Sequence, residues 1–244
     1  MTNSTCLNDI DVVLLAGGLG TRIRDTLGDT PKLLARVNDR PFLDFLIWRL
    51  KGFGAGRLIL GLGHLGEHVV EHLKSHPPEG LDIVTLIEPE PFGTAGALRF
   101  IAPRVESDPV MVMNGDSFTG ADLCNFVQAH HRSGAEGSIL ATEVEDTAQY
   151  GRLNVSPEGR VLEIFEKDSR QTGPGLINAG VYLFDAAMMA RIEGTEGPSL
   201  ERDVFQALDP GTLSAVVGQG LFIDIGTAES LAGAAEVLKP FSPS

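Results

Sequence analysis

The chain is poor in cysteine, in basic residues and in long apolar runs. Its 244 residues include only Cys6 and Cys124, too few for a disulfide framework, so we expect inert, unpaired thiols in a reducing cytoplasm. With 33 acidic against 19 basic residues, the net charge of −14 leaves no basic face for nucleic acid or an anionic membrane. No stretch approaches the ~20 apolar residues of a membrane span, and the polar N-terminal segment lacks the apolar core of a signal peptide. These absences predict a soluble, cytoplasmic protein without nucleic-acid or membrane partners.

The first half of the chain alternates between apolar segments of strand length and amphipathic segments of helix length. The expected strands lie at 11–15, 58–62, 83–87 and 110–113, and the expected helices at 42–52, 66–74, 94–101 and 123–131. This alternation is typical of an α/β fold with a mostly parallel sheet flanked by helices. Because such sheets bind ligands at the carboxyl ends of their strands, the loops at 17–32, 88–96 and 114–118 should converge on one crevice.

The second half is richer in strand-like segments. Its expected strands lie at 139–144, 151–155, 161–165, 177–184 and 213–217, with helices at 199–208 and 228–238. We expect this half to extend the sheet and to close one side of the crevice. The result is a single domain over residues 10–238, with flexible tails at 1–9 and 239–244.

A buried strand leads directly into a glycine-rich, cationic turn near the N-terminus. The four residues at 12–15 are apolar without alternation, which is typical of a strand covered on both faces. The glycines that follow let backbone N–H groups approach an anion, and three cations come next in the chain: Gly17, Gly18 and Gly20, then Arg22, Arg24 and Lys32. Glycines alone would also suit a structural turn, but with the cations they predict a nucleoside triphosphate site.

Two familiar glycine motifs are excluded by what surrounds this turn. The sequence after Gly18 and Gly20 lacks the third glycine that a dinucleotide-binding fold needs, and the strand at 58–62 ends without the acidic residue that would hold a ribose. No Gly-Lys-Ser/Thr follows either. Hydride transfer and P-loop hydrolysis are therefore poor interpretations.

Two aspartates follow apolar strands far apart in the sequence. Asp116 lies in Asn114-Gly115-Asp116, and Asp224 precedes Ile225-Gly226-Thr227. Either residue alone would suit a turn or a helix cap. Magnesium bound to nucleotide phosphates takes one or two carboxylates and leaves its other positions to water and phosphate. Together with the phosphate loop, the pair predicts a split magnesium site.

A rigid loop with two prolines and two glycines begins at Glu88 and suits a flat base. An ionised carboxylate only accepts hydrogen bonds, so Glu88 complements the N–H donors on the Watson–Crick edge of guanine and opposes the carbonyls of uracil or thymine. The alternative is an acidic turn residue in solvent.

The second half offers polar residues that suit a sugar phosphate. Glu166 and Lys167 end a strand, and Asn178 begins the next apolar run; the alternative is a surface ion pair beside a structural asparagine. Histidines recur at four-residue spacing, which a solvated helix edge explains better than a metal site: His64, His68, His72 and His76.

From Val12 to Leu238 the sequence resembles the sugar-1-phosphate nucleotidyltransferases. The motifs that carry the resemblance are Ala16-Gly17-Gly18-Leu19-Gly20-Thr21-Arg22, Pro31-Lys32, Gly93-Thr94-Ala95-Gly96-Ala97, Asn114-Gly115-Asp116, Tyr150-Gly151, Glu166-Lys167 and Asp224-Ile225-Gly226-Thr227. The segments at 175–182, 199–201 and 222–227 look most like the D-glycero-α-D-manno-heptose 1-phosphate guanylyltransferases.

The resemblance implies a Rossmann-like, GT-A-like nucleotidyltransferase fold with a nucleotide-binding half at 10–135 and a sugar-binding half at 136–238. It implies the following roles: catalysis by Arg22, Lys32 and Asp116; nucleotide binding by Leu15, Ala16, Gly17, Gly18, Gly20, Thr21, Arg22, Glu88, Gly93, Thr94 and Asn114; sugar-phosphate binding by Tyr150, Gly151, Glu166, Lys167 and Asn178; and Mg²⁺ binding by Asp116 and Asp224. The family pattern has proline where this chain has Leu33 and Asp168, which puts the hold on the phosphate lysine and the sugar preference in doubt.

The reaction implied is transfer of a guanylyl group from GTP to heptose 1-phosphate, with release of pyrophosphate. Three alternatives stay open: a mannose, hexose or N-acetylmuramate 1-phosphate nucleotidyltransferase that uses GTP or UTP, a molybdenum cofactor guanylyltransferase, and a non-catalytic regulatory subunit that binds sugar nucleotides. The sequence also leaves a homodimer open.

Overall fold

The computed structural model describes residues 5–18, 20–165 and 172–241. The strands are β1 (Val12–Ala16), β2 (Arg36–Val37), β3 (Arg40–Pro41), β4 (Arg57–Leu62), β5 (Asp82–Ile87), β6 (Val110–Asn114), β7 (Ser117–Thr119), β8 (Gly137–Val144), β9 (Arg152–Val155), β10 (Val161–Phe165), β11 (Gly175–Phe184), β12 (Leu213–Val217) and β13 (Phe222–Asp224). The α-helices are α1 (Arg24–Leu27), α2 (Phe42–Gly52), α3 (Gly66–Ser75), α4 (Gly93–Ile101), α5 (Leu123–Ser133), α6 (Ala186–Glu193) and α7 (Ala228–Val237). Short 3-10 helical turns are η1 (Lys32–Leu34), η2 (Ala102–Arg104), η4 (Phe205–Ala207) and η5 (Lys239–Phe241), and η3 (Leu200–Val204) is a π-helical turn.

The described strands form a central nine-stranded sheet with a parallel and an antiparallel part. One path runs β10-β9-β11-β6-β1-β4-β5, and β8 joins β11 to β12. Strands β6, β1, β4 and β5 are parallel, while β11 is antiparallel to β6, β8 and β9. The predicted mixed, mostly parallel sheet flanked by helices is therefore confirmed.

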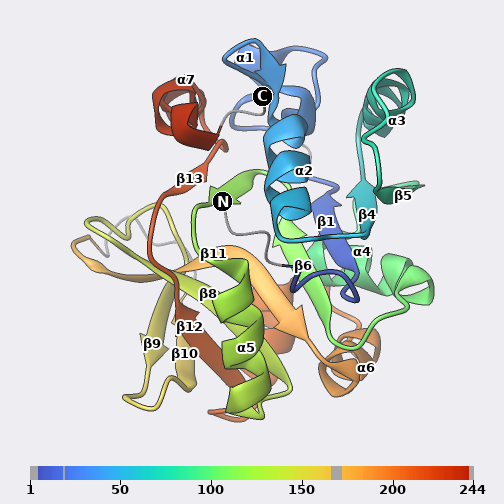
Figure 1. The fold of residues 1–244 in the computed structure, drawn as a ribbon. Helices are drawn as coiled ribbons and strands as arrows, with labels where there is room; N and C mark the ends of the chain where they lie inside the picture. The colour runs from blue at the N-terminus through green and yellow to red at the C-terminus, as the bar shows by residue number, and fades with distance from the viewer. Residues whose placement is uncertain (1–4, 19, 166–171, 242–244) are drawn as a thin grey trace.

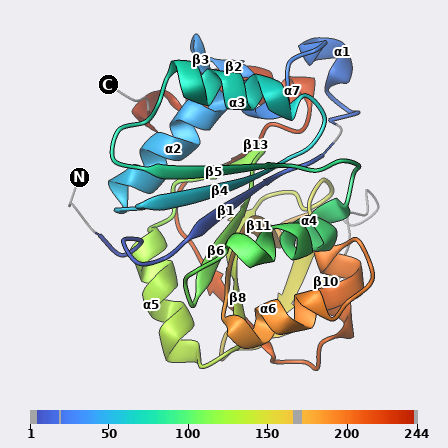
Figure 2. The same ribbon diagram turned by 90° about the vertical axis from the view of Figure 1, so that its right-hand side faces the viewer.

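Helices cover both faces of this sheet (Figures 1 and 2). On one face, apolar side chains of α2, α3, α5 and α7 pack in a core that includes Phe42, Phe45 and Phe126. On the other face, α4, α6 and the η3–η4 segment pack in a second core around Tyr182 and Phe184. Burial on both faces explains why β1 is apolar at every position.

Most predicted elements agree with the structure, but three features differ: the segment expected as a helix at 199–208, α6, and the ribbon of β7 with β13. The helix expected at 199–208 is the irregular η3–η4 segment, in which the Ser199 hydroxyl accepts a hydrogen bond from the Arg202 N–H. Helix α6 and the short ribbon of β7 with β13 have no counterpart in the predicted elements. A three-residue strand carries too little periodicity to be recognised without its partner.

The expectation of a flexible tail does not hold for residues 5–9. Leu7 is fully buried, and its N–H donates to the Phe53 carbonyl at 3.1 Å. At the other end, Phe241 lies in η5 and contacts the Phe118 ring at a centroid distance of 5.2 Å. Among the described helices, none is long and apolar enough to cross a membrane.

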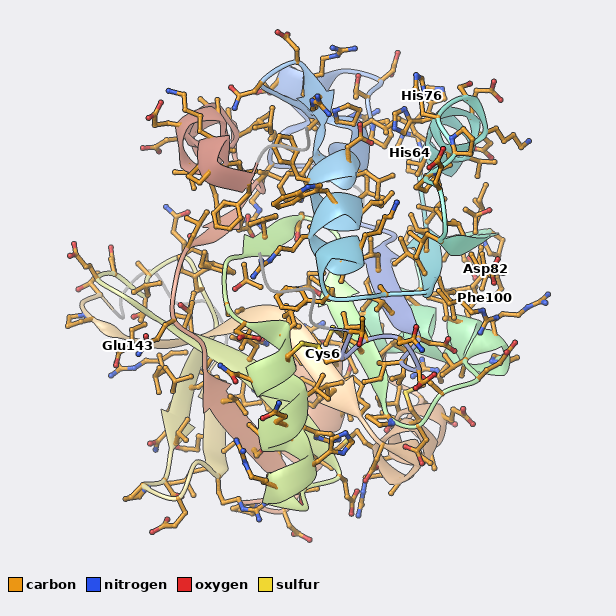
Figure 3. The ribbon with its side chains drawn as sticks, in the orientation of Figure 1. Cys6, His64, His76, Asp82, Phe100 and Glu143 are labelled. Carbon is orange, nitrogen blue, oxygen red and sulfur yellow. A yellow bond between two sulfur atoms is a disulfide. The ribbon has the colours of Figure 1, made fainter. Side chains whose placement is uncertain are left out.

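The expectation of unpaired cysteines is wrong, because Cys6 and Cys124 form a disulfide. Their Cα atoms lie 5.5 Å apart although 118 positions separate them in the sequence. Figure 3 labels Cys6 beside the first turn of α5, where Cys124 follows the Asp122 cap. The two thiols meet only because the segment before β1 packs against α5. Their spacing of 118 positions therefore could not predict the bond.

We expect Cys6→Ser to lower the free energy of unfolding by about 4 kcal/mol, because the bond closes a long loop in the unfolded chain. The measurement is urea unfolding of the oxidised parent, the reduced parent and the variant. Cys124→Ser is the matched control, since it removes the same bond and should unfold at the same urea concentration. Equal midpoints for the oxidised parent and Cys6→Ser would contradict this account.

Candidate active site

A cavity of about 300 Å³ opens at the carboxyl ends of β1, β4, β5 and β6. All three loops that the sequence brings to this edge contribute to its lining. The predicted site residues in its wall are Leu15, Ala16, Gly17, Gly18, Gly20, Lys32, Glu88, Gly93, Thr94, Asn114 and Asp116. Thr21 and Arg22 are exposed and do not belong to this lining.

Close packing surrounds two glycines at the carboxyl ends of β1 and β4. A Cβ atom on Gly17 would collide with the carboxylate of Glu88, and one on Gly63 would collide with the Gly17 backbone. Gly20 has a φ of +59°, a left-handed conformation that suits glycine. The ends of β1, β4 and β5 therefore lie close together. At Gly17, Gly20 and Gly63 the chain offers backbone, without a side chain, to this region.

Glu88 follows β5 and is buried against this turn, with 6% of its surface exposed. Its Oε2 accepts a hydrogen bond from the Phe92 N–H at 3.0 Å, whereas Oε1 has no hydrogen-bond partner among the described residues. Burial raises the pKa of the Glu88 carboxyl above its ordinary value. A buried acceptor without a partner is costly, and it marks a place where a ligand donor would be stabilised.

Lys32 reaches across the glycine turn to Asp116. Its Nζ lies 2.9 Å from Asp116 Oδ2, and both side chains are partly exposed. The aliphatic part of Lys32 runs past Gly20, where a Cβ would lie 3.5 Å from Lys32 Cε. The phosphate lysine and the carboxylate after β6 therefore share one place, although 84 positions separate them.

The ribbon of β7 and β13 brings Asp224 to the same place. Asp224 pairs with Ser117, and the Ile225 N–H donates to the Asp116 carbonyl at 2.8 Å. Arg22 lies beside the next turn, since a Cβ on Gly226 would be 3.5 Å from its Nη2. Both predicted aspartates, together with Arg22 and Lys32, thus lie on one side of the molecule.

The donor set fits magnesium better than zinc. Asp116 and Asp224 supply carboxylate oxygens, and within the described part of the chain no group of three or more His, Cys, Asp or Glu side chains is arranged to hold a metal. Zinc sites need three or four such protein ligands, whereas magnesium at a nucleotide keeps water and phosphate in most positions.

The predicted sugar residues within the described part of the chain are linked to one another, and Tyr150 lies near Asp224. The Asn178 N–H donates to the Gly151 carbonyl at 3.0 Å, and Tyr150 packs edge-on against Phe222 of β13. Desolvation, with a smaller contribution from the charge of Asp224, raises the pKa of the Tyr150 phenol. Glu166 and Lys167 lie outside the described residues, as do Leu19 and Asp168.

The family profile described as nucleotidyl transferase matches residues 11–239. The chain belongs to this family. The assignment made from the glycine turn, Asn114-Gly115-Asp116 and the other motifs is thus confirmed, and with it a transferase fold and enzyme class.

Named relatives of this nucleotidyl transferase are sugar-1-phosphate guanylyltransferases. The chain is 31% identical to the D-glycero-alpha-D-manno-heptose 1-phosphate guanylyltransferase of Campylobacter jejuni, over 90% of this chain and 96% of the relative. It is 30% identical to a mannose-1-phosphate guanylyltransferase of Mycobacterium tuberculosis, over 97% of this chain and 67% of that protein. For the Drosophila pseudoobscura mannose-1-phosphate guanylyltransferase catalytic subunit beta the chain spans only 61% of the length.

Solved structures of this fold include HddC from Yersinia pseudotuberculosis. It superimposes with a TM-score of 0.84 at 32% identity, over 94% of this chain and all of HddC, and a second HddC structure contains GMP-PN. A putative glucose-1-phosphate thymidylyltransferase from Bacillus anthracis, at 23% identity and a TM-score of 0.81, shares the fold.

Sequence reasoning missed the turn between β4 and α3 as part of the cavity wall. His64, Leu65 and Gly66 of this turn line the cavity, and Leu65 has a φ of +62°. Figure 3 labels His64 beside α3. His72 instead contacts Asp44, with 2.9 Å between Nε2 and Oδ1. A left-handed leucine before a helix is a conformation that propensity does not reveal.

We expect Glu88→Gln to stabilise the nucleotidyl transferase most at alkaline pH. With its pKa raised in the folded state, the Glu88 carboxyl contributes its full stability below the ordinary glutamate pKa, and this contribution is lost as the pH rises through the raised value. Glutamine does not titrate, so the Tm of the variant minus that of the parent should be larger at pH 8 than at pH 4.

Thermal unfolding at the two pH values measures this difference. Glu90→Gln is the matched control, since Glu90 is exposed two positions further on. A Tm difference that does not change with pH would show that ionisation of the buried Glu88 carboxyl does not lower the free energy of unfolding.

Proposed function

We propose that the protein transfers a guanylyl group from GTP to a sugar 1-phosphate, with heptose 1-phosphate as the favoured acceptor, and releases pyrophosphate. The observation that carries the proposal is the Lys32–Asp116 pair at the mouth of the glycine turn, with Asp224 brought to the loop of Asp116 by the β7–β13 ribbon. The Campylobacter relative adds support, because its name states this acceptor and the chain spans 96% of it.

Guanine suits the end of the cavity that Glu88 closes. The Oε1 atom of this carboxylate, which lacks a partner among the described residues, would accept from the N1–H or N2–H of guanine after a small side-chain rotation. Uracil would present a carbonyl there. Gly93, whose φ is +73° and whose Cβ would collide with the Pro198 carbonyl, lines the same cavity.

The sugar 1-phosphate needs no general base in this reaction. Its second pKa is about 6, so it is mostly dianionic at pH 7, and one of its oxygens attacks the α-phosphorus in line as pyrophosphate leaves. The difficulty is to bring anions together in a protein of net charge −14. Lys32 and Arg22 offset that charge locally, and the glycine-turn amides orient the phosphates.

Magnesium would supply further charge neutralisation between the phosphates, held by Asp116 and Asp224. Lys32 now neutralises Asp116, so binding of the triphosphate with its metal requires the ammonium group to exchange the carboxylate for phosphate oxygens. Asp224 stays anchored by the Gly226 N–H, which donates to Oδ1 at 2.6 Å.

The acceptor would lie over Asn178, Gly151 and Tyr150, with Glu166 and Lys167 as further proposed contacts. A mannose, hexose or N-acetylmuramate 1-phosphate, with GTP or UTP, is the alternative within this class. A molybdenum cofactor guanylyltransferase would not need the sugar side, and a non-catalytic subunit would not need Lys32 beside Asp116. We further propose that the protein works in the cytoplasm and forms a homodimer.

We expect pyrophosphate release from GTP with heptose 1-phosphate, and little from UTP, CTP or ATP. A matrix of four nucleoside triphosphates against heptose, mannose, glucose and N-acetylmuramic acid 1-phosphates, with magnesium present, measures this preference. Equal rates with GTP and UTP would refute the guanine assignment. No release in any combination would favour the non-catalytic subunit.

We expect Lys32→Ala to lower kcat by about 100-fold or more, because it removes a cation from the charge that develops on the phosphates. Initial rates at saturating GTP and sugar 1-phosphate measure the loss. Lys74→Ala, on the exposed side of α3, is the matched control and should keep the parent rate. A Lys32→Ala variant within a factor of three of the parent would remove this lysine from the mechanism.

A further inference from the structure

A chain of hydrogen bonds leads from the bulge of β11 to the η3 segment. The Gly180 N–H donates to Asn178 Oδ1 at 2.9 Å, Asn178 Nδ2 donates to the Tyr182 hydroxyl at 2.8 Å, and that hydroxyl donates to Glu201 Oε1 at 3.4 Å. The Ser199 hydroxyl donates a hydrogen bond to Glu201 Oε2 at 3.3 Å. Four of these five residues lie beyond those that the family resemblance assigns to the site.

The direction of this chain follows from what each group can do. A backbone N–H can only donate, so the atom of Asn178 that faces Gly180 must be the oxygen. The amide nitrogen then faces Tyr182 and donates, which leaves the single hydroxyl hydrogen of Tyr182 for the Glu201 carboxylate, an acceptor when ionised. Tyr182 is fully buried, and desolvation raises the pKa of its phenol well above the ordinary value, so the hydrogen stays in place.

The orientation of the Asn178 amide matters for the reaction because of where Asn178 lies. Its backbone N–H is bonded to the Gly151 carbonyl. The bulge turns the chain toward the loop of Asp116, because Gly180 has a φ of +69° and a Cβ there would lie against Asn114. Under the proposed function the acceptor lies over Asn178, so the remaining N–H and lone pair of this amide meet it in one fixed orientation.

Resting on the proposed function, we infer that Tyr182 and Glu201 are positioning residues that set the orientation of the Asn178 amide against the sugar 1-phosphate. Tyr182 and Glu201 therefore contribute to the binding of the acceptor. The η3 segment also contacts the base loop, since the Leu200 N–H donates to Thr94 Oγ1 at 2.8 Å, so Glu201 is held by the same framework as the nucleotide wall.

Tyr182→Phe removes the hydroxyl and keeps the ring stacked on Phe184, where the centroids lie 5.5 Å apart. We expect KM for the sugar 1-phosphate to rise roughly tenfold, the effect of about one hydrogen bond to a polar ligand. KM for GTP and kcat at saturating acceptor should stay within a factor of two. Glu201→Gln should raise the same KM, because an amide oxygen is a weaker acceptor for the Tyr182 hydrogen than a carboxylate, and the amide NH2 can face the hydroxyl instead.

The double variant is the diagnostic measurement. Because Glu201 acts through Tyr182, adding Glu201→Gln to Tyr182→Phe should raise KM no further, whereas two separate structural defects would multiply. Glu193→Gln, exposed on α6, is the matched control and should change nothing. Thermal unfolding of each variant shows that it is folded.

Three outcomes would overturn the inference: an unchanged acceptor KM in Tyr182→Phe, an equal rise in the KM for GTP, or multiplicative effects in the double variant. A parent that releases pyrophosphate with none of the sugar 1-phosphates would overturn the proposed function and this inference with it. An active parent whose Tyr182→Phe variant keeps its KM would overturn the inference alone.

Discussion

The parallel alignment of β1 with β6 is the constraint on which the site depends. The Gly115 N–H donates to the Leu15 carbonyl at 2.8 Å, which extends the pairing of the two strands beyond their ends. Gly115 is closely packed, since a Cβ there would lie 3.1 Å from the Leu15 oxygen and would require its neighbours to shift. The glycine turn and Asp116 therefore leave the sheet at the same level, and Lys32 can span the gap between them.

The antiparallel half supplies the second constraint through one irregular strand. In β11 the register shifts between Asn178 and Tyr182, and Gly180 takes the left-handed conformation at the shift. Bulges of this kind redirect side chains next to active sites. Here the bulge brings Gly180 against Asn114, just before the loop of Asp116, while Tyr182 stays in the core, so one strand serves both the core and the site.

Charge is arranged locally in an otherwise acidic molecule. Lys32 and Arg22 lie beside Asp116 and the turn after Asp224, and the glycine amides add no formal charge. Such an arrangement attracts phosphates only at short range, because the surrounding protein repels anions. Recognition of the nucleotide then depends on close contacts, and the uncompensated Oε1 of Glu88 is one that a guanine donor would satisfy.

The sequence by itself determined the order of strands and helices in the first half, the three loops at one edge, and the residue types suited to phosphate and base. These are local signals: apolar runs, glycines in a turn and residues directly after a strand. Only the tertiary structure decided that Cys6 meets Cys124, that β13 carries Asp224 to Asp116, and that Tyr182 links Asn178 to Glu201. Each of these contacts joins side chains or short strands from separate elements, and the free energy that selects them comes from packing, which no local pattern encodes.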